Sequence, residues 1–227
     1  TDKVTMISAL YVEAEVRDHP RTQRLLERFD QVPHIECERY TEVFNRHGQD
    51  FRMQKQRPAM ILAKKHGQLV HPTPPTYGIG RQHNYYFSHM LNCIYDCRYC
   101  FLQGLYQSAN YVLFVNFEDF QMQMERLIAE HGSEPVTFFS GYDCDSFALD
   151  SLTHFATEHL DFIAKHPQAE LELRTKSLKA NDLLAQEPLP NVITAFSLTP
   201  EVISNAYEHG VPPLNRRLTL IQKLAQS

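Results

Sequence analysis

Three of the five cysteines in the chain lie within eight positions, in the stretch N-C-I-Y-D-C-R-Y-C-F. Cys93, Cys97 and Cys100 give the spacing C-x3-C-x2-C. Thiolates grouped in this way are ligands for zinc or for iron–sulfur clusters. Polar and charged residues alternate with the cysteines, which is not the pattern of a buried core strand. The spacing therefore predicts a metal centre.

The kind of metal centre depends on a fourth ligand. A structural zinc site needs four protein ligands, and only His83 and His89 precede the cysteines nearby. Zinc knuckles usually contain two C-x2-C pairs, whereas this triplet is unpaired. Three thiolates suit three corners of a cubane cluster, whose fourth iron stays open to a small molecule. We predict a 4Fe-4S cluster held by the three cysteines, with zinc as the alternative.

Composition narrows the class of protein. The chain has 227 residues and a formal charge of −5, so it has no global attraction to nucleic acid. No apolar run reaches the length of a membrane span, no signal peptide is visible, and the cysteine count is odd. We expect a protein without a membrane segment in the reducing cytoplasm. Cys37 is expected to be a small buried residue.

Basic residues gather between positions 46 and 81, where Asp50 is the only acid. They are Arg46, Arg52, Lys55, Arg57, Lys64, Lys65 and Arg81. The stretch is either a patch that faces phosphates or an ordinary solvated surface, and the apolar run 60–63 inside it favours the second interpretation.

The metal-binding loop needs a scaffold, and the hydrophobic pattern predicts one in two parts. Strands are expected at Val4–Val16, His34–Cys37 and Pro58–Ala63, with a helix from His19-Pro20 to Phe29. A proline- and glycine-rich connector follows at His71–Gly80. We therefore expect a small N-terminal α/β unit over residues 1–75 and a core over residues 76–227.

Strands and helices alternate in the second part. The expected strands are Tyr85–Met90, Val136–Phe139, Glu170–Arg174 and Val192–Leu198. The expected helices are Phe117–Glu130, Ser146–Lys165, Ser177–Leu184 and Leu214–Leu224. Such repeats predict a mostly parallel sheet. About four units fall short of a closed eight-unit barrel of roughly 250 residues, so we expect an open, partial β/α barrel whose C-terminal part is missing.

The cysteine loop resembles the signature of the radical SAM superfamily. Cys93, Cys97, Tyr99 and Cys100 match its C-x3-C-x-aromatic-C pattern after the first core strand. The resemblance implies a 4Fe-4S cluster that binds S-adenosyl-L-methionine (SAM). One electron then cleaves SAM to a 5′-deoxyadenosyl radical, and Tyr99 lies against the adenine. An electron donor such as a flavodoxin or ferredoxin is an expected partner.

A narrower resemblance, to the spore photoproduct lyase family, extends over most of the chain. The supporting stretches include Tyr85–Tyr106, Tyr111–Asn116, Asp145–Thr153, Leu173–Ser177 and Ala195–Leu198. These lyases repair the thymine dimer 5-thyminyl-5,6-dihydrothymine, and a cysteine thiol returns a hydrogen atom. The resemblance implies that this chain is a lyase that acts on damaged DNA.

The resemblance also implies residues that bind SAM. Lys176 aligns with a lysine that contacts the SAM carboxylate, and Ser197 aligns with a serine at a strand end that hydrogen-bonds SAM. Many radical SAM enzymes carry Gly-Gly-Glu after the second core strand, for the methionyl ammonium. This chain has Ser140, Gly141, Tyr142 and Asp143 there, and Asp143 is the expected acceptor.

Two positions depart from the lyase pattern. The family's hydrogen-donor cysteine aligns near Tyr142, while the chain's own cysteine in this loop is Cys144; both are candidate catalytic residues. The lyases have Tyr after the third cluster cysteine, and this chain has Phe101. Two alternatives therefore stay open: a radical SAM enzyme with another substrate, and a metal-stabilised binding module without turnover.

Overall fold

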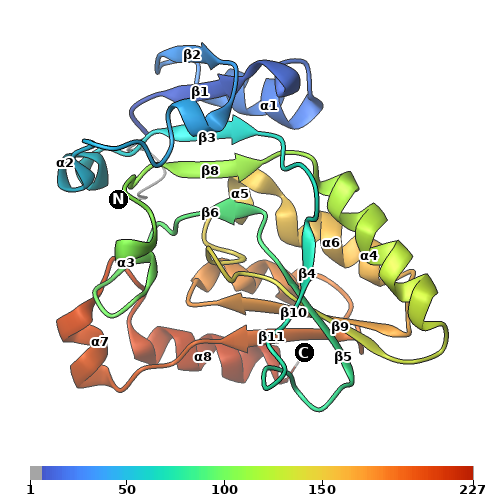
Figure 1. The fold of residues 1–227 in the computed structure, drawn as a ribbon. Helices are drawn as coiled ribbons and strands as arrows, with labels where there is room; N and C mark the ends of the chain where they lie inside the picture. Colours follow the sequence, from blue (N-terminus) through green and yellow to red (C-terminus); the bar gives the residue numbers. More distant parts are fainter. Residues whose placement is uncertain (1–6, 227) are drawn as a thin grey trace.

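The computed structural model describes residues 7–226, which form two five-stranded sheets and a two-stranded ribbon. Figure 1 shows the two sheets one above the other, with α4 (Phe117–His131) and α6 (Phe155–Ile163) along one side of them. One hydrophobic core extends from Ile7 to Leu220 and joins both sheets. None of the described helices is long and apolar enough to cross a membrane.

The first sheet contains the N-terminal strands and two strands from beyond residue 75. In spatial order its strands are β2 (His34–Cys37), β1 (Leu10–Glu13), β3 (Met60–Ala63), β8 (Tyr111–Phe114) and β6 (Met90–Leu91). All neighbours are parallel except β6 and β8. The strand β3 is fully buried, as expected for a parallel strand covered on both faces. The predicted boundary near residue 75 stays a prediction.

The second sheet contains the parallel strands that lead to the predicted site. In spatial order they are β11 (Val192–Phe196), β10 (Ala169–Thr175), β9 (Val136–Phe139), β5 (His83–Phe87) and β4 (Val70–Pro72). Only the β4–β5 pair is antiparallel. The ribbon pairs β12 (Glu208–His209) with β7 (Asp96–Cys97). The predicted α/β class with mostly parallel sheets is confirmed.

The helices connect these strands, and the longer ones bury one face. They are α1 (Pro20–Arg28), α2 (Phe51–Gln56), α3 (Leu102–Leu105), α4, α5 (Asp150–Thr153), α6, α7 (Glu201–Tyr207) and α8 (Leu214–Leu224), with short 3-10 helices η2 (Ala14–Val16), η3 (Tyr40–Glu42) and η4 (Leu178–Ala185). In α4 the buried residues Phe117, Phe120, Met124 and Ile128 recur at helical spacing. That amphipathic pattern is why the sequence predicted this helix closely.

The predicted single strand Tyr85–Met90 is wrong, because the chain changes sheets within it. The strand β5 ends at Phe87 in the second sheet, and β6 begins at Met90 in the first. Ser88 and His89 make the crossing, and both are buried. The His89 carbonyl accepts a hydrogen bond from the Phe114 N–H at 2.9 Å. This crossing delivers the chain directly to the cysteine loop.

Other predicted elements differ in their limits. The helix predicted over Ser146–Lys165 divides at His154, whose φ of 54° ends α5. Ser177–Leu184 is a 3-10 helix rather than an α-helix. The first predicted strand shortens to Leu10–Glu13, and its residues 4–6 lie outside the described residues.

Candidate active site

A cavity of about 290 Å³ opens at the carboxyl ends of the parallel strands and contains the three clustered thiols. Ligands of open α/β sheets bind at this end. The predicted site residues on its wall are Cys93, Cys97, Tyr99, Cys100, Gly141, Tyr142, Cys144, Lys176 and Ser197. The tertiary structure thus brings together four separate segments of the chain: the cysteine loop and the ends of β9, β10 and β11.

The cysteine loop is held by backbone and side-chain contacts. Asn92, at a φ of 68°, turns the chain, and its amide donates to the carbonyls of Ser108 at 2.7 Å and Asn110 at 2.8 Å. Cys97 lies in β7, and the Cys97 carbonyl accepts a hydrogen bond from the Cys100 N–H at 2.9 Å. These hydrogen bonds fix the backbone of the loop that carries the three thiols.

The three clustered thiols are candidate ligands of a metal centre. All are free, and burial raises the pKa of Cys93 and of Cys97. A tetrahedral ion with Zn–S bonds of about 2.3 Å would place sulfurs about 3.8 Å apart. Among residues 7–226, the three sulfurs do not all lie within 4.8 Å of one another.

A buried carboxylate that the sequence did not single out joins the two sides of the cavity. Glu208 is paired with Cys97 in the β7–β12 ribbon. Burial opposes its charge, but the donors around it outweigh burial and lower its pKa. Those donors are Tyr99, Lys176 at 2.9 Å, Thr199 at 2.8 Å, Ser204 at 2.6 Å and Arg217 at 2.8 Å.

Glu208 fixes the positions of two predicted SAM ligands. The Lys176 ammonium lies 5.8 Å from the centre of the Tyr99 ring, and both groups donate to Glu208. Burial opposes the charge of Lys176, yet the hydrogen bonds to Glu208 and Tyr99 raise its pKa. Lys176 therefore stays a cation in the cavity wall, suited to an anionic ligand.

The loop after β9 is closely packed at Gly141. Its φ is 79°, and a Cβ there would lie 2.8 Å from the Ser146 hydroxyl and 3.2 Å from the Arg174 carbonyl. Glycine is the residue that accepts both the left-handed backbone and the close approach. This position lets the loop fold against the end of β10.

Asp145 ties the same loop to the second sheet. Its carboxylate accepts from the N–H groups of Phe147 at 3.0 Å, Ala148 at 2.9 Å and Lys176 at 2.7 Å, and from the Thr175 hydroxyl at 2.7 Å. The sequence showed Asp145 only as part of a family stretch. The signal that could have found it is an Asp placed two and three residues before backbone N–H groups that its side chain can cap.

Two predicted SAM ligands lie off the cavity wall. The Ser140 hydroxyl is buried, contacts the Ser146 hydroxyl at 2.6 Å and donates to the Glu172 carbonyl at 2.9 Å. The side chain of Asp143 is not among those lining the cavity. Burial raises the pKa of Asp143, and Lys65 is the nearby cation. Their contact with SAM stays a prediction.

Cys144 and Tyr142 occupy opposite environments. Cys144 is buried on the cavity wall, with its sulfur 3.7 Å from Nδ1 of His89. Burial, with nearby Asp143 and Asp145, raises its pKa well above the ordinary value, so the group is a thiol. Tyr142 is 55% exposed at the cavity mouth.

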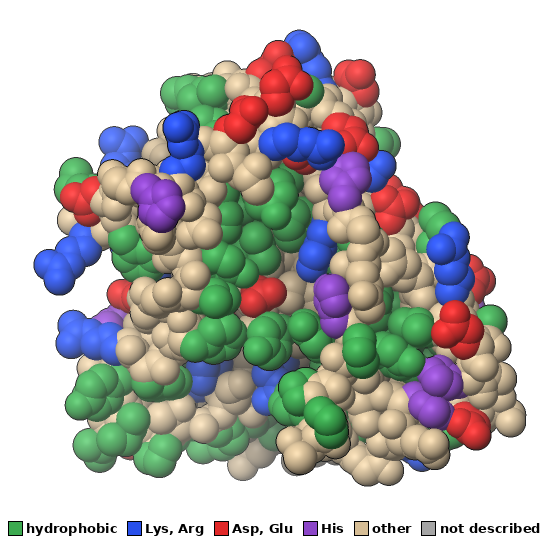
Figure 2. Space-filling model, viewed as in Figure 1, with side chains coloured by type: hydrophobic (Ala, Val, Ile, Leu, Met, Phe, Trp, Pro, Cys, Tyr) green, Lys and Arg blue, Asp and Glu red, His purple; other side chains and the backbone are tan. Residues whose placement is uncertain are grey.

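Aromatic rings extend outward from the cavity mouth. The Tyr142 ring lies 5.6 Å from Phe101 and 4.9 Å from Tyr86, and Tyr86 stacks on His71 at 5.4 Å. Figure 2 shows hydrophobic side chains gathered on the middle of this face, with basic and histidine side chains around them. Exposed aromatic rings of this kind can accept the face of a base.

The basic stretch of residues 46–81 does not form one free patch. Lys55 pairs with Asp96 at 3.1 Å, Lys64 pairs with Glu15 at 3.1 Å and Arg81 bonds Glu170. Lys65 is half-buried, with its ammonium over the Phe114 and Phe120 rings. These contacts support the interpretation of an ordinary surface.

Comparison with known proteins was made at the level of family, sequence and fold. A family model described as spore photoproduct lyase matches residues 6–227. The spore photoproduct lyase of Bacillus subtilis is 22% identical over 225 residues, which cover 96% of this chain and 64% of the relative. That of a Geobacillus species is 28% identical over 134 residues, which cover 59% of this chain and 39% of the relative.

Solved structures share the fold. A spore photoproduct lyase variant with bound AdoMet and dinucleoside spore photoproduct superposes with a TM-score of 0.83 at 22% identity. A lyase complexed with dinucleoside spore photoproduct gives 0.81 at the same identity. Both matches cover 97% of this chain and 64% of the solved chain. The chain thus spans less than two thirds of the length of these relatives.

Proposed function

The chain belongs to the spore photoproduct lyase family, and we propose that it is a radical SAM lyase that repairs a thymine-dimer lesion in DNA. The observation that carries this proposal is the single cavity in which the three clustered thiols meet Tyr99, Lys176 and Cys144. We also propose that the parallel strands form part of an open β/α barrel, with the cavity at its carboxyl end.

Cys93, Cys97 and Cys100 would hold the cluster, and their unpaired C-x3-C-x2-C spacing on one cavity wall supports a cluster over one zinc ion. When bound, the cluster and SAM supply a 5′-deoxyadenosyl radical, with the electron delivered by a donor such as a flavodoxin or ferredoxin. Lys176 would bind the carboxylate of SAM as a fixed cation, and Ser197 would donate to SAM from the end of β11.

Gly141 and Asp145 would shape the other wall. The Gly141 backbone can approach a ligand closely, because it has no side chain at a left-handed φ. Tyr99 would lie against the adenine, with its hydroxyl held by Glu208. Ser140 and Asp143, in the same loop as Gly141, would bind SAM as well, with Asp143 as the acceptor for the methionyl ammonium.

Cys144 would return a hydrogen atom to the substrate radical. The S–H bond breaks, a C–H bond forms on the substrate carbon, and a thiyl radical stays on Cys144. The buried position on the cavity wall and the raised pKa both support a protonated thiol. Tyr142 is the alternative donor from the same loop, through its phenol.

The test is anaerobic reconstitution followed by SAM cleavage with and without DNA that contains 5-thyminyl-5,6-dihydrothymine. We expect 5′-deoxyadenosine to form and thymine to be restored. Cys97→Ala should lose iron, and Cys37→Ala, a thiol away from the cavity, should keep it. Iron retention by Cys97→Ala, or the absence of 5′-deoxyadenosine, would contradict the proposal and favour a binding module without turnover.

Cys144→Ala separates the donor role from SAM cleavage. The variant should form 5′-deoxyadenosine normally but divert the thymine radical to side products. An unchanged product distribution would contradict the assignment and turn attention to Tyr142→Phe. Cys37→Ala again serves as the matched control.

A second candidate function keeps the radical chemistry with another substrate. It is favoured by Phe101, which lines the cavity where the lyases have a tyrosine and cannot donate a hydroxyl hydrogen. Turnover of SAM without repair of the lesion would support this candidate. Gain of repair activity in Phe101→Tyr would instead return the chain to the lyase reaction.

A further inference from the structure

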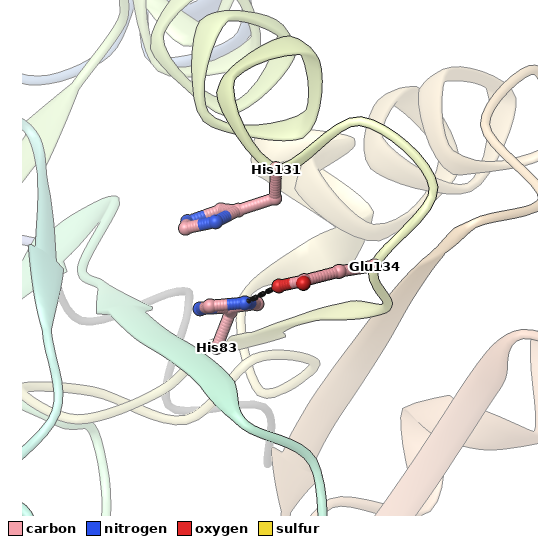
Figure 3. Close-up of side chains that lie close together, drawn as sticks. All are labelled: His83, His131 and Glu134. Carbon is pink, nitrogen blue, oxygen red and sulfur yellow. Dashed lines mark hydrogen bonds and ion pairs between the residues drawn. The ribbon is translucent and has the colours of Figure 1, made fainter.

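Two histidines and a glutamate lie close together at the end of the second sheet that is remote from the thiols. One ligand atom each from His83, His131 and Glu134 lies within 4.8 Å of the others. Figure 3 shows the two imidazole rings face to face, with the Glu134 carboxylate at the edge of the His83 ring. The lyase proposal uses none of these residues.

The local fold brings the three side chains together. His83 is the first residue of β5, and His131 is the last residue of α4. Gly132, at a φ of 60°, then reverses the chain, and the Glu134 N–H donates to the His131 carbonyl at 3.0 Å. Because β5 and β9 pair in parallel with His83 opposite Val136, the turn leaves Glu134 beside His83.

The contacts within this group already hold the three side chains close together. Nε2 of His83 bonds a carboxylate oxygen of Glu134. The two imidazole rings stack with centroids 3.6 Å apart. Nε2 of His131 bonds the Tyr85 hydroxyl at 2.7 Å, a contact typical of the outer partner that orients a metal-ligating histidine.

We propose that His83, His131 and Glu134 bind a divalent transition-metal ion, with Zn²⁺ as the best match. Two imidazoles and one carboxylate form a zinc donor set that leaves a fourth position for water. With metal–ligand bonds of about 2.0–2.1 Å, tetrahedral ligand atoms lie about 3.3 Å apart. The ion would displace the proton between His83 and Glu134 to solvent.

Binding requires a modest side-chain rearrangement. The rings must turn out of their stack so that each ring nitrogen points at the ion. The Glu134 side chain, which is 60% exposed, has room to move toward an ion, whereas the His83 side chain is 17% exposed and would turn within its place. If His131 ligates through Nδ1, its bond to Tyr85 can persist.

The surrounding charge favours a cation. His131 ends the 15-residue helix α4, and the carboxyl end of a helix carries partial negative charge. Glu134 adds a full negative charge. Arg81, which lies two residues before β5, is bonded by Glu170.

The site is separate from the thiol cavity. His83 begins β5 and Glu134 precedes β9, whereas cavity residues such as Gly141, Lys176 and Ser197 follow the carboxyl ends of their strands. A five-residue strand spans roughly 16 Å. A bound ion would fasten the end of α4 to the first residue of β5 and to the turn before β9. This inference does not depend on the lyase proposal.

Zinc stoichiometry and Co²⁺ spectra test the inference. In cluster-loaded protein dialysed against Zn²⁺, we expect one zinc per chain beyond the cluster iron. In Cys93→Ser/Cys97→Ser/Cys100→Ser protein, Co²⁺ should give visible d–d bands of a four-coordinate site without thiolate charge-transfer absorption. Zn²⁺ should also raise the Tm of both proteins.

Matched variants make the result specific. His131→Ala and Glu134→Gln should each weaken zinc binding at least 10-fold and abolish the Tm shift, while His166→Ala, at a histidine after α6, should leave both unchanged. Glu134→Gln changes an exposed side chain, so it keeps the test valid if a histidine variant fails to fold. Equal zinc affinity in wild type and Glu134→Gln, or no bound zinc, would overturn the inference and leave an ion pair only.

Discussion

Glu208 shows how one buried residue can decide the state of several others. It lies between the buried Arg217 guanidinium and the Lys176 ammonium, and both pair with its carboxylate. Arg217 is fully buried, so its charge has no water to replace a lost partner. Removal of one member of a buried ion pair costs far more than the intact pair contributes.

We predict that Glu208→Gln lowers the free energy of unfolding by about 3–5 kcal/mol. The amide keeps the shape of the side chain but leaves Arg217 and Lys176 without a carboxylate. Urea denaturation followed by circular dichroism measures the change. Glu201→Gln, at an exposed glutamate in the first turn of α7, is the control and should change stability by less than about 0.5 kcal/mol. Equal effects of the two substitutions would contradict the central role of Glu208.

At the scale of the element, the loop after β9 depends on one backbone conformation. We predict that Gly141→Ala lowers the free energy of unfolding by about 1–3 kcal/mol, because a Cβ there meets the Ser146 hydroxyl and strains a left-handed backbone. The same change should weaken SAM binding, since the loop forms one cavity wall. Thermal denaturation and calorimetric titration with SAM measure both effects.

The control is Gly104→Ala in α3, where a Cβ would meet no atom within 4 Å. That substitution should leave stability unchanged or raise it by up to about 1 kcal/mol. A loss of stability as large as that of Gly141→Ala would show that the close approach at Gly141 is not the cause.

The helix α6 carries a buried histidine that couples stability to pH. His159 packs among Phe87, Phe117 and Phe155, and Nδ1 bonds the Phe155 carbonyl at 2.9 Å. Burial lowers its pKa from 6.5 to about 4. The unfolded chain therefore binds a proton that the folded chain does not, and stability falls as the pH decreases from about 6.5 to about 4.

We predict that the unfolding free energy of wild type falls relative to that of His159→Phe by about 2–3 kcal/mol between pH 7 and pH 4.5, at about 1.36 kcal/mol per pKa unit. Urea denaturation at the two pH values measures the difference. Phe155→Leu, which removes no titratable group from the same cluster, should cost the same at both. A constant difference between wild type and His159→Phe would contradict the prediction.

At the scale of the whole molecule, the two sheets behave as one packed body. β8 and β6 follow the predicted boundary near residue 75 and yet complete the N-terminal sheet. The buried strand β3 packs in the same core as β9 and β10. The N-terminal strands therefore have no separate core among residues 7–226.

We predict that both sheets unfold in one cooperative transition. Hydrogen exchange of backbone amides in β1 and β3 should show the same denaturant midpoint as that of amides in β9 and β10, because both sets depend on the shared core. Mass spectrometry of exchanged peptides measures the two midpoints. Separate midpoints would support an independent unit over residues 1–75.

The sequence by itself determined the local features of this protein. The spacing of Cys93, Cys97 and Cys100 predicted a metal loop, since ligand spacing is a property of a short segment. The periodic burial of α4 and the apolar stretch of β9 fixed these elements closely, because side chains three or four positions apart share a helix face and short apolar runs suit buried strands.

Only the tertiary structure decided the features that depend on distant partners. The chain changes sheets at Ser88 and His89, a step that local pattern cannot show, because it depends on which distant strands pair with β5 and β6. Glu208 bonds Tyr99, which lies more than a hundred positions earlier in the chain, and Lys176, which lies more than thirty positions earlier. His83 bonds Glu134 because β5 and β9 pair in parallel. Such contacts follow from strand register and chain crossing, which no short segment encodes.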